Sequence, residues 1–102
     1  MNPTLLTANT IYTFKLNSGE ELVAKVLEIN DNTFFIEHPV SIAPGPQGMG
    51  LVPSMITANM DKSVQLNINS VALVAETDDA VSAKYIEATT GITIPDKKII
   101  MG

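Results

Sequence analysis

The sequence contains neither cysteine nor arginine. Without cysteine, disulfide bonds and thiolate metal sites are excluded. Six lysines face eleven acidic residues, which gives a net charge of −5. A nucleic-acid binder that neutralises phosphates across its surface needs the opposite balance. Any contact with a nucleic acid must therefore come from a small local site.

Long hydrophobic runs are also missing. Residues 1–10 carry no basic stretch followed by an apolar one, so we expect no signal peptide. No apolar run approaches the length needed to cross a bilayer. We therefore expect a cytoplasmic protein without a membrane partner.

Charged residues are scarce for a chain of this apolar content. They make up 17% of the residues, whereas apolar residues make up 45%, which is typical of a folded protein with a neutral polar surface. A surface so poor in charge favours cover by a partner. With 102 residues and no linker or repeat, we expect residues 1–102 to form one domain with its core over 11–76.

The first part of the chain predicts two strands. Residues 11–17 alternate apolar and polar side chains, and the turn-forming segment 17–19 follows. Residues 21–29 are apolar on both faces, as in a long bent strand that switches faces. A helix is the alternative there, because Glu, Leu, Ala and Lys favour helices. We favour a strand because a turn lies on either side.

The next part predicts an extended hairpin. A turn at 30–32 leads into a third strand over 33–36, which continues past Pro39 to residue 42. Pro39 lacks a backbone donor and so predicts an edge or a bulge. The three glycines and two prolines of 44–50 predict an irregular loop tip, after which the chain returns over 51–58.

The last strands and a helix follow. Residues 64–68 and 71–75 predict two apolar strands separated by a short turn. Residues 78–91 predict a helix that Thr77 or Asp78 caps, with Val81 and Tyr85 one turn apart. We predict no structure for the tail, 92–102.

Together these elements predict an all-β fold. Five short strands with tight turns describe a small, strongly bent and partly open barrel of the SH3-like kind, with an extended hairpin between its third and fourth strands and a short C-terminal helix.

The pattern of the first strands resembles the first signature of the Sm-like (LSm, Hfq-type) family. An apolar pair, a glycine turn, an apolar–small–apolar strand, a polar turn and an apolar strand occur in the family's order. They are Phe14, Leu16, Gly19, Leu22, Ala24, Val26, the turn at 30–32 and residues 34–36. Residues 68–74 resemble the second signature in outline.

Two departures concern the family's nucleotide site. The position of its base-contacting asparagine falls on Phe34 or Phe35, and its Arg-Gly pair is Asn69-Ser70. The resemblance therefore implies the fold more than the uridine site. Arginine-free variants of this kind are similar to Sm-like proteins encoded by phages.

The resemblance also implies a cyclic homo-oligomer. In Sm-like rings the fourth strand of one subunit pairs with the fifth strand of the next. Here those strands are 64–68 and 71–75, which lack the lysines that often block edge pairing. The expected interface residues are Val64, Leu66, Ile68, Val71 and Leu73.

Two functions stay open at this point. One is a ring that binds single-stranded RNA in or near its lumen through stacking and amide contacts. The other is a non-catalytic scaffold that binds proteins. The phenylalanines could instead belong to the core or to a subunit interface, and the asparagines to turns. The candidate RNA-binding residues are Asn30, Asn32, Phe34, Phe35, Asn69 and Lys25.

The polar residues assemble no catalytic set. His38 is the only histidine, and Asp78-Asp79 stands where a helix cap is expected. Residues 44–50 lack the Lys-Ser or Lys-Thr of a phosphate loop. We expect no enzyme, no metal site and no cofactor.

Overall fold

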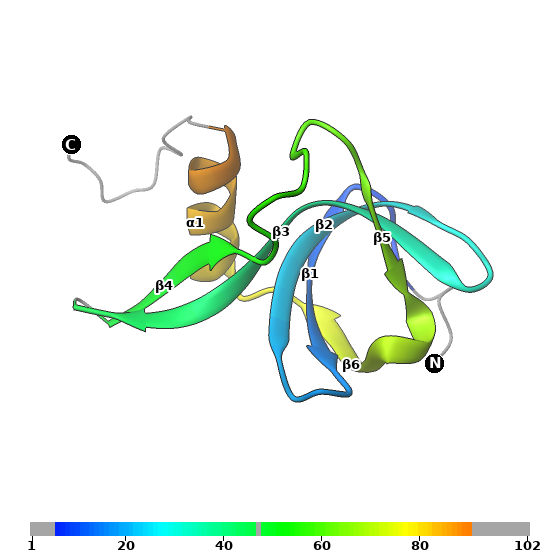
Figure 1. Cartoon of the computed structure of the whole chain (residues 1–102), viewed down its shortest axis with the longest axis horizontal. Helices are drawn as coiled ribbons and strands as arrows, with labels where there is room; N and C mark the ends of the chain where they lie inside the picture. Colours follow the sequence, from blue (N-terminus) through cyan, green and yellow to red (C-terminus); the bar gives the residue numbers. More distant parts are fainter. Residues whose placement is uncertain (1–5, 47, 91–102) are drawn as a thin grey trace.

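The computed structural model describes residues 6–46 and 48–90, so the predicted tail at 92–102 lies outside the described residues. These residues form one antiparallel sheet and a single short helix, α1 (Figure 1). The elements are β1 (Thr10–Leu16), β2 (Glu21–Ile29), β3 (Thr33–Gly45), β4 (Gly48–Pro53), β5 (Val64–Asn67), the 3₁₀ turn η2 (Ile68–Ser70), β6 (Val71–Glu76) and α1 (Asp79–Thr90).

The strands pair in the order β4-β3-β2-β1-β6, and β5 pairs with β3. The strand at 21–29 is confirmed and the helical alternative is wrong. The sheet is not closed, because β5 pairs with β3 and β6 pairs with β1, while no pairing within 6–46 and 48–90 joins β5 to β6. The 3₁₀ turn η2 crosses between them.

Residues 6–46 and 48–90 form six strands, where five were predicted. Residues 44–50 are not an irregular loop: β3 runs to Gly45, β4 begins at Gly48, and these two glycines are paired. Gly48 has a φ of 102°, which an L side chain rarely adopts, so glycine here permits the short connection. The return strand also ends earlier than predicted, because β4 stops at Pro53 and residues 54–58 are not strand.

A bend divides β3 into two halves. Its first half pairs with β5 and its second half with β4, so one strand serves two neighbours on the same side. At the bend His38 has a φ of 50°, a left-handed conformation that histidine adopts more readily than most residues. The register with β2 shifts between Val23 and Lys25, opposite Pro39. The predicted irregularity at Pro39 is confirmed as this bulge.

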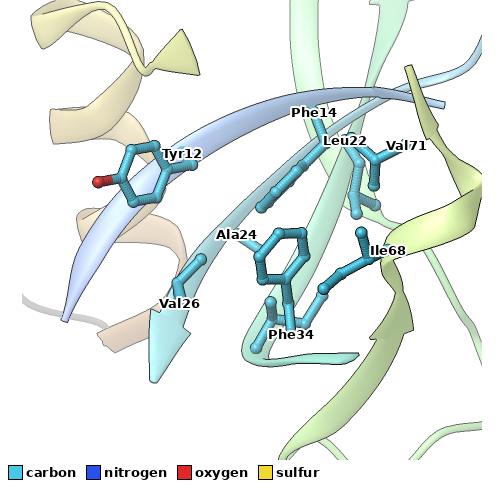
Figure 2. Packing of buried hydrophobic residues seen from close by; sticks show 9 residues of the cluster. Tyr12, Phe14, Leu22, Ala24, Val26, Phe34, Ile68 and Val71 are labelled. Atoms are coloured by element: carbon cyan, nitrogen blue, oxygen red, sulfur yellow. The ribbon is translucent and has the colours of Figure 1, made fainter. Parts of the chain in front are cut away.

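The main core lies inside the bent sheet (Figure 2). Phe14 and Phe34 are fully buried, and their ring centroids are 5.5 Å apart. A second register shift, between Val26 and Glu28, lets Ile29 pack on the same side as Val26. This shift is the change of face predicted for 21–29. The buried members of this core are Tyr12, Phe14, Leu22, Ala24, Val26, Phe34, Ile36, Ile68 and Val71.

A smaller cluster holds α1 on the outer face of the sheet, which we define as the face that carries Val23, Val40 and Ile42. Tyr85 is 2% exposed and packs there with Val23 and Val40. Val81, one turn earlier, packs against the same cluster, as its spacing predicts.

Asp78 caps α1, as one of the two predicted candidates. Its Oδ2 accepts hydrogen bonds from the backbone N–H of Ala80 at 3.0 Å and of Val81 at 3.4 Å. These bonds satisfy N–H groups that have no partner within the helix. The capping interpretation of Asp78-Asp79 is therefore confirmed.

The Tyr85 hydroxyl connects α1 to two strands at the bulge. It accepts a hydrogen bond from the N–H of Lys25 at 3.0 Å and donates one to the carbonyl of Glu37 at 2.5 Å. Lys25 and Glu37 are register partners on β2 and β3. Burial, together with the nearby Glu37 charge, raises the pKa of Tyr85 to about 12, although the Lys25 N–H favours the ionised form.

Replacing Tyr85 with Phe tests this connection. The change leaves the ring in place but removes the partner of the Lys25 N–H and of the Glu37 carbonyl, which are partly buried. We expect the free energy of unfolding to fall by about 1–3 kcal/mol, measured by urea denaturation.

Tyr12→Phe is the matched control. The Tyr12 hydroxyl accepts one hydrogen bond, from the N–H of the exposed Thr7. Water can replace that acceptor, so we expect a loss below about 1 kcal/mol. A loss for Tyr12→Phe equal to that for Tyr85→Phe would contradict the proposed role of the Tyr85 hydroxyl.

The raised pKa of Tyr85 predicts a loss of stability at alkaline pH. The folded state keeps the Tyr85 proton to about pH 12, whereas the unfolded state loses it near the ordinary value of 10.0. The Tyr85 contribution is therefore full below pH 10 and declines as the pH rises toward 12. From pH 9 to pH 11, the urea concentration at the midpoint of unfolding should fall further for the wild type than for Tyr85→Phe. Parallel pH profiles for the two proteins would refute this assignment.

Candidate functional site

Three strand edges of the described sheet have no strand partner: β4 pairs only with β3, and the other two edges belong to β5 and β6. β5 pairs only through one side, with β3, and β6 pairs only through one side, with β1. β5 has no charged residue, and β6 has only Glu76, at its end. Free backbone groups on uncharged edges are suited to pair with another strand.

The predicted interface side chains divide into two groups. Ile68 and Val71 are buried in the main core, and Val64 and Leu66 pack partly against it. Leu73 is 67% exposed. The first four side chains thus stabilise the chain's own core, and the edges offer their backbone and Leu73. Successive side chains of a strand point to opposite faces, so Val71 and Leu73 would share a face in a regular strand. The register shift in the β1–β6 pair lies between them and explains why Val71 is buried and Leu73 is exposed. Because both faces of β6 are apolar, the sequence alone does not show which face is inside.

Two asparagine-containing loops lie at the same end of the sheet. The N–H of Ile68 donates to the carbonyl of Asn32 at 3.0 Å, which joins η2 to the β2–β3 turn. The Asn17 side-chain amide donates to the carbonyl of Asn69 at 2.7 Å, and the Asn69 N–H donates to Asn67 Oδ1 at 2.9 Å. Asn32 and Asn69, which come from distant parts of the sequence, are therefore brought together.

The other candidate RNA-binding residues are placed differently. Asn30 is exposed in the β2–β3 turn, and its N–H donates to the carbonyl of Thr33 at 2.8 Å. Phe35 is half-buried on β3, opposite Gln65 of β5, whereas Phe34 is fully buried in the core. Lys25 lies on the outer face beside Tyr85. Of the two phenylalanines, only Phe35 has a surface that could stack on a base.

The charge around these loops is not positive. The described part of the chain contains four lysines, at 15, 25, 62 and 84, and none lies in the 30–32 or 67–70 loops. Asp31 adds a carboxylate to the first loop. Contacts here would have to come from amides and from Phe35, without neutralisation of phosphates.

His38 has a structural position at the bend of β3. Its Nδ1 lies 3.4 Å from Glu37 Oε2, and both side chains are about one-third exposed. Among residues 6–46 and 48–90, no three His, Asp or Glu side chains are grouped as metal ligands. In the same residues, no helix is long and apolar enough to cross a membrane.

A cavity that the sequence did not predict lies between α1 and the β3–β4 hairpin. It has a volume of about 330 Å³, and its apolar lining includes Val23, Ile42, Leu51 and Val81. Sequence reasoning missed it because 44–50 was taken for an irregular loop. The alternation of Met49 and Leu51 between glycines was the available signal.

Comparison with known proteins does not place the chain in a family. No protein-family model matches the sequence, and no curated protein matches it.

Proposed function

We propose that this chain is a non-catalytic, Sm-like barrel domain that assembles with copies of itself into a closed ring. The free edges of β5 and β6 are the observation that carries the proposal. Pairing β5 of one copy with β6 of the next would use each of these two edges once and would leave the β4 edge free. Such a head-to-tail contact closes into a ring when the rotation between subunits allows it.

The arrangement of the strands supports the barrel. β1 pairs with both β2 and β6, the bent β3 pairs with both β2 and β5, and η2 connects β5 to β6. This is the order of strands expected for a small SH3-like barrel with one open seam. The seam lies between β5 and β6, where the proposed subunit contact would form.

The edges also favour assembly on energetic grounds. A domain of this size buries a modest core, so a partner adds appreciable stability. The exposed Leu73 side chain would lose contact with water on pairing, worth roughly 1–2 kcal/mol at full burial. β5 and β6 lack the lysines that commonly prevent edge-to-edge association.

The ring would serve as a scaffold that binds proteins, and this is the function that we favour. A net charge of −5 without arginine suits protein partners better than nucleic acid. The second candidate is binding of single-stranded RNA at the 30–32 and 67–70 loops. It is supported by the joining of Asn32 to η2, next to Asn69.

The ring is tested by light scattering on the wild type and on Leu73→Lys. A lysine at this exposed edge position should disfavour pairing without disturbing the core. We expect a closed oligomer for the wild type and smaller species for Leu73→Lys at the same concentration.

Ile56→Lys is the control for Leu73→Lys. Ile56 is 93% exposed and lies between β4 and β5, outside any strand. It should keep the subunit number of the wild type. A monomeric wild type, or an equal effect of both variants, would contradict the proposed ring.

RNA binding is tested by fluorescence anisotropy with short U-rich and A-rich RNAs at low and moderate salt. If the 30–32 and 67–70 loops bind RNA, Phe35→Ala and Asn69→Ala should each weaken binding by about five- to 150-fold, because base stacking or an amide contact is worth about 1–3 kcal/mol. Asn59→Ala, in the loop after β4, should have no effect. A ring that binds neither RNA at low salt leaves protein scaffolding as its function.

A further inference from the structure

The cavity beside α1 has an apolar interior and an open mouth. Val23, Ile42 and Leu51 come from three adjacent strands of the outer face, and Val81 comes from α1. Met49 also lines the cavity and is 65% exposed. A volume of about 330 Å³ is large enough for one large apolar side chain.

Contacts at two points fix the position of α1 against the sheet. Before its first turn, the Thr77 N–H donates to the carbonyl of Ile11 at 3.3 Å, and the Thr77 and Thr13 hydroxyls are 2.9 Å apart. Further along, the Tyr85 hydroxyl is bonded to β2 and β3. These contacts fix the distance between α1 and the sheet, so the cavity is largely formed before anything binds.

The surroundings of the cavity carry more carboxylates than amines. Glu21 begins β2, Asp79 begins α1 and Asp78 caps that helix; all three are exposed. Glu21 and Asp78 line the cavity itself, as does Lys84 from the second turn of α1. The described part of the chain has ten acidic residues and four lysines, so its overall field has the same sign.

We propose that this cavity binds one large apolar side chain of a partner protein, presented by a peptide segment that carries lysine or arginine beside it. The apolar lining takes the side chain, and the carboxylates at the starts of β2 and α1 attract the adjacent cations. The same carboxylates repel phosphates, so a nucleic acid is not the occupant. The site lies on the outer face near β4, and Thr77, the residue after β6, is part of its lining.

The site is tested with a fluorescein-labelled synthetic peptide, Gly-Lys-Lys-Phe-Lys-Gly, and anisotropy at low and moderate salt. Replacing the peptide's Phe with Ser should abolish measurable binding, since the apolar anchor is then lost. Met49→Ser should weaken binding of the Phe peptide about three- to fivefold. Val81→Phe, which fills the cavity from α1, should weaken it further.

Variants that change the charge around the cavity separate recognition of the peptide's lysines from a general structural effect. Loss of carboxylates should weaken peptide binding, whereas loss of a lysine should strengthen it. Glu21→Gln combined with Asp79→Asn should weaken binding about two- to tenfold, with most of the loss at low salt. Neither residue is the helix cap, which is Asp78. Lys84→Gln should strengthen binding about twofold, because it removes a like charge from the lining.

Ile56→Ser is the matched control for Met49→Ser, since Ile56 is more exposed and does not line the cavity. The proposal is overturned if the Ser peptide binds as well as the Phe peptide, or if Met49→Ser binds as tightly as Ile56→Ser. Met49 is exposed, so this comparison stands even if Val81→Phe fails to fold. Light scattering on the same variants measures the number of subunits independently of peptide binding. A monomer that binds the peptide would refute the proposed ring but not the proposed peptide site.

Discussion

The Tyr85 hydroxyl is the interaction on which the arrangement of this domain most depends. It lies between the backbones of β2 and β3 where their register shifts and β3 bends. A bulge leaves backbone groups to be satisfied in some other way. A side chain from the C-terminal helix supplies both a donor and an acceptor, so the bend and the helix stabilise each other.

The bend determines which surfaces the molecule presents. Because β3 turns at His38, its first half receives β5 and its second half receives β4. The hairpin therefore projects from the rest of the sheet, with α1 beside it, as Figure 1 shows. The position of β5, and the cavity between the hairpin and α1, both result from this division of one long strand.

Local patterns in the sequence predicted much of the fold. Alternation and turn residues located β1, β2, β5 and β6, and the acidic residues before Val81 located the start of α1. The hairpin was only partly predicted, because proline and glycine indicate loops on average, while the φ of 102° at Gly48 depends on the pairing around it.

Site residues were harder to predict, because their placement depends on non-local contacts. Alternation sends one of Phe34 and Phe35 inward, but the packing of Phe34 against Phe14 decides which one. Asn32 and Asn69 are adjacent only because η2 returns to the β2–β3 turn. The partner of the Tyr85 hydroxyl could not be inferred, since a register shift in a distant strand pair creates it.

The pairing of β1 with β6 has a consequence for how the chain folds. Tyr12 pairs with Glu76, so this ladder joins β1 and β6, which are the first and last strands along the described sequence. The β1–β2 and β2–β3 ladders, by contrast, connect neighbouring segments and can form as soon as those segments leave the ribosome. Closing a loop of this length is slow relative to hairpin formation. During synthesis, β1 therefore keeps an unpaired edge until the residues of β6 have emerged, and this interval is when the nascent chain is most open to pairing with the wrong strand.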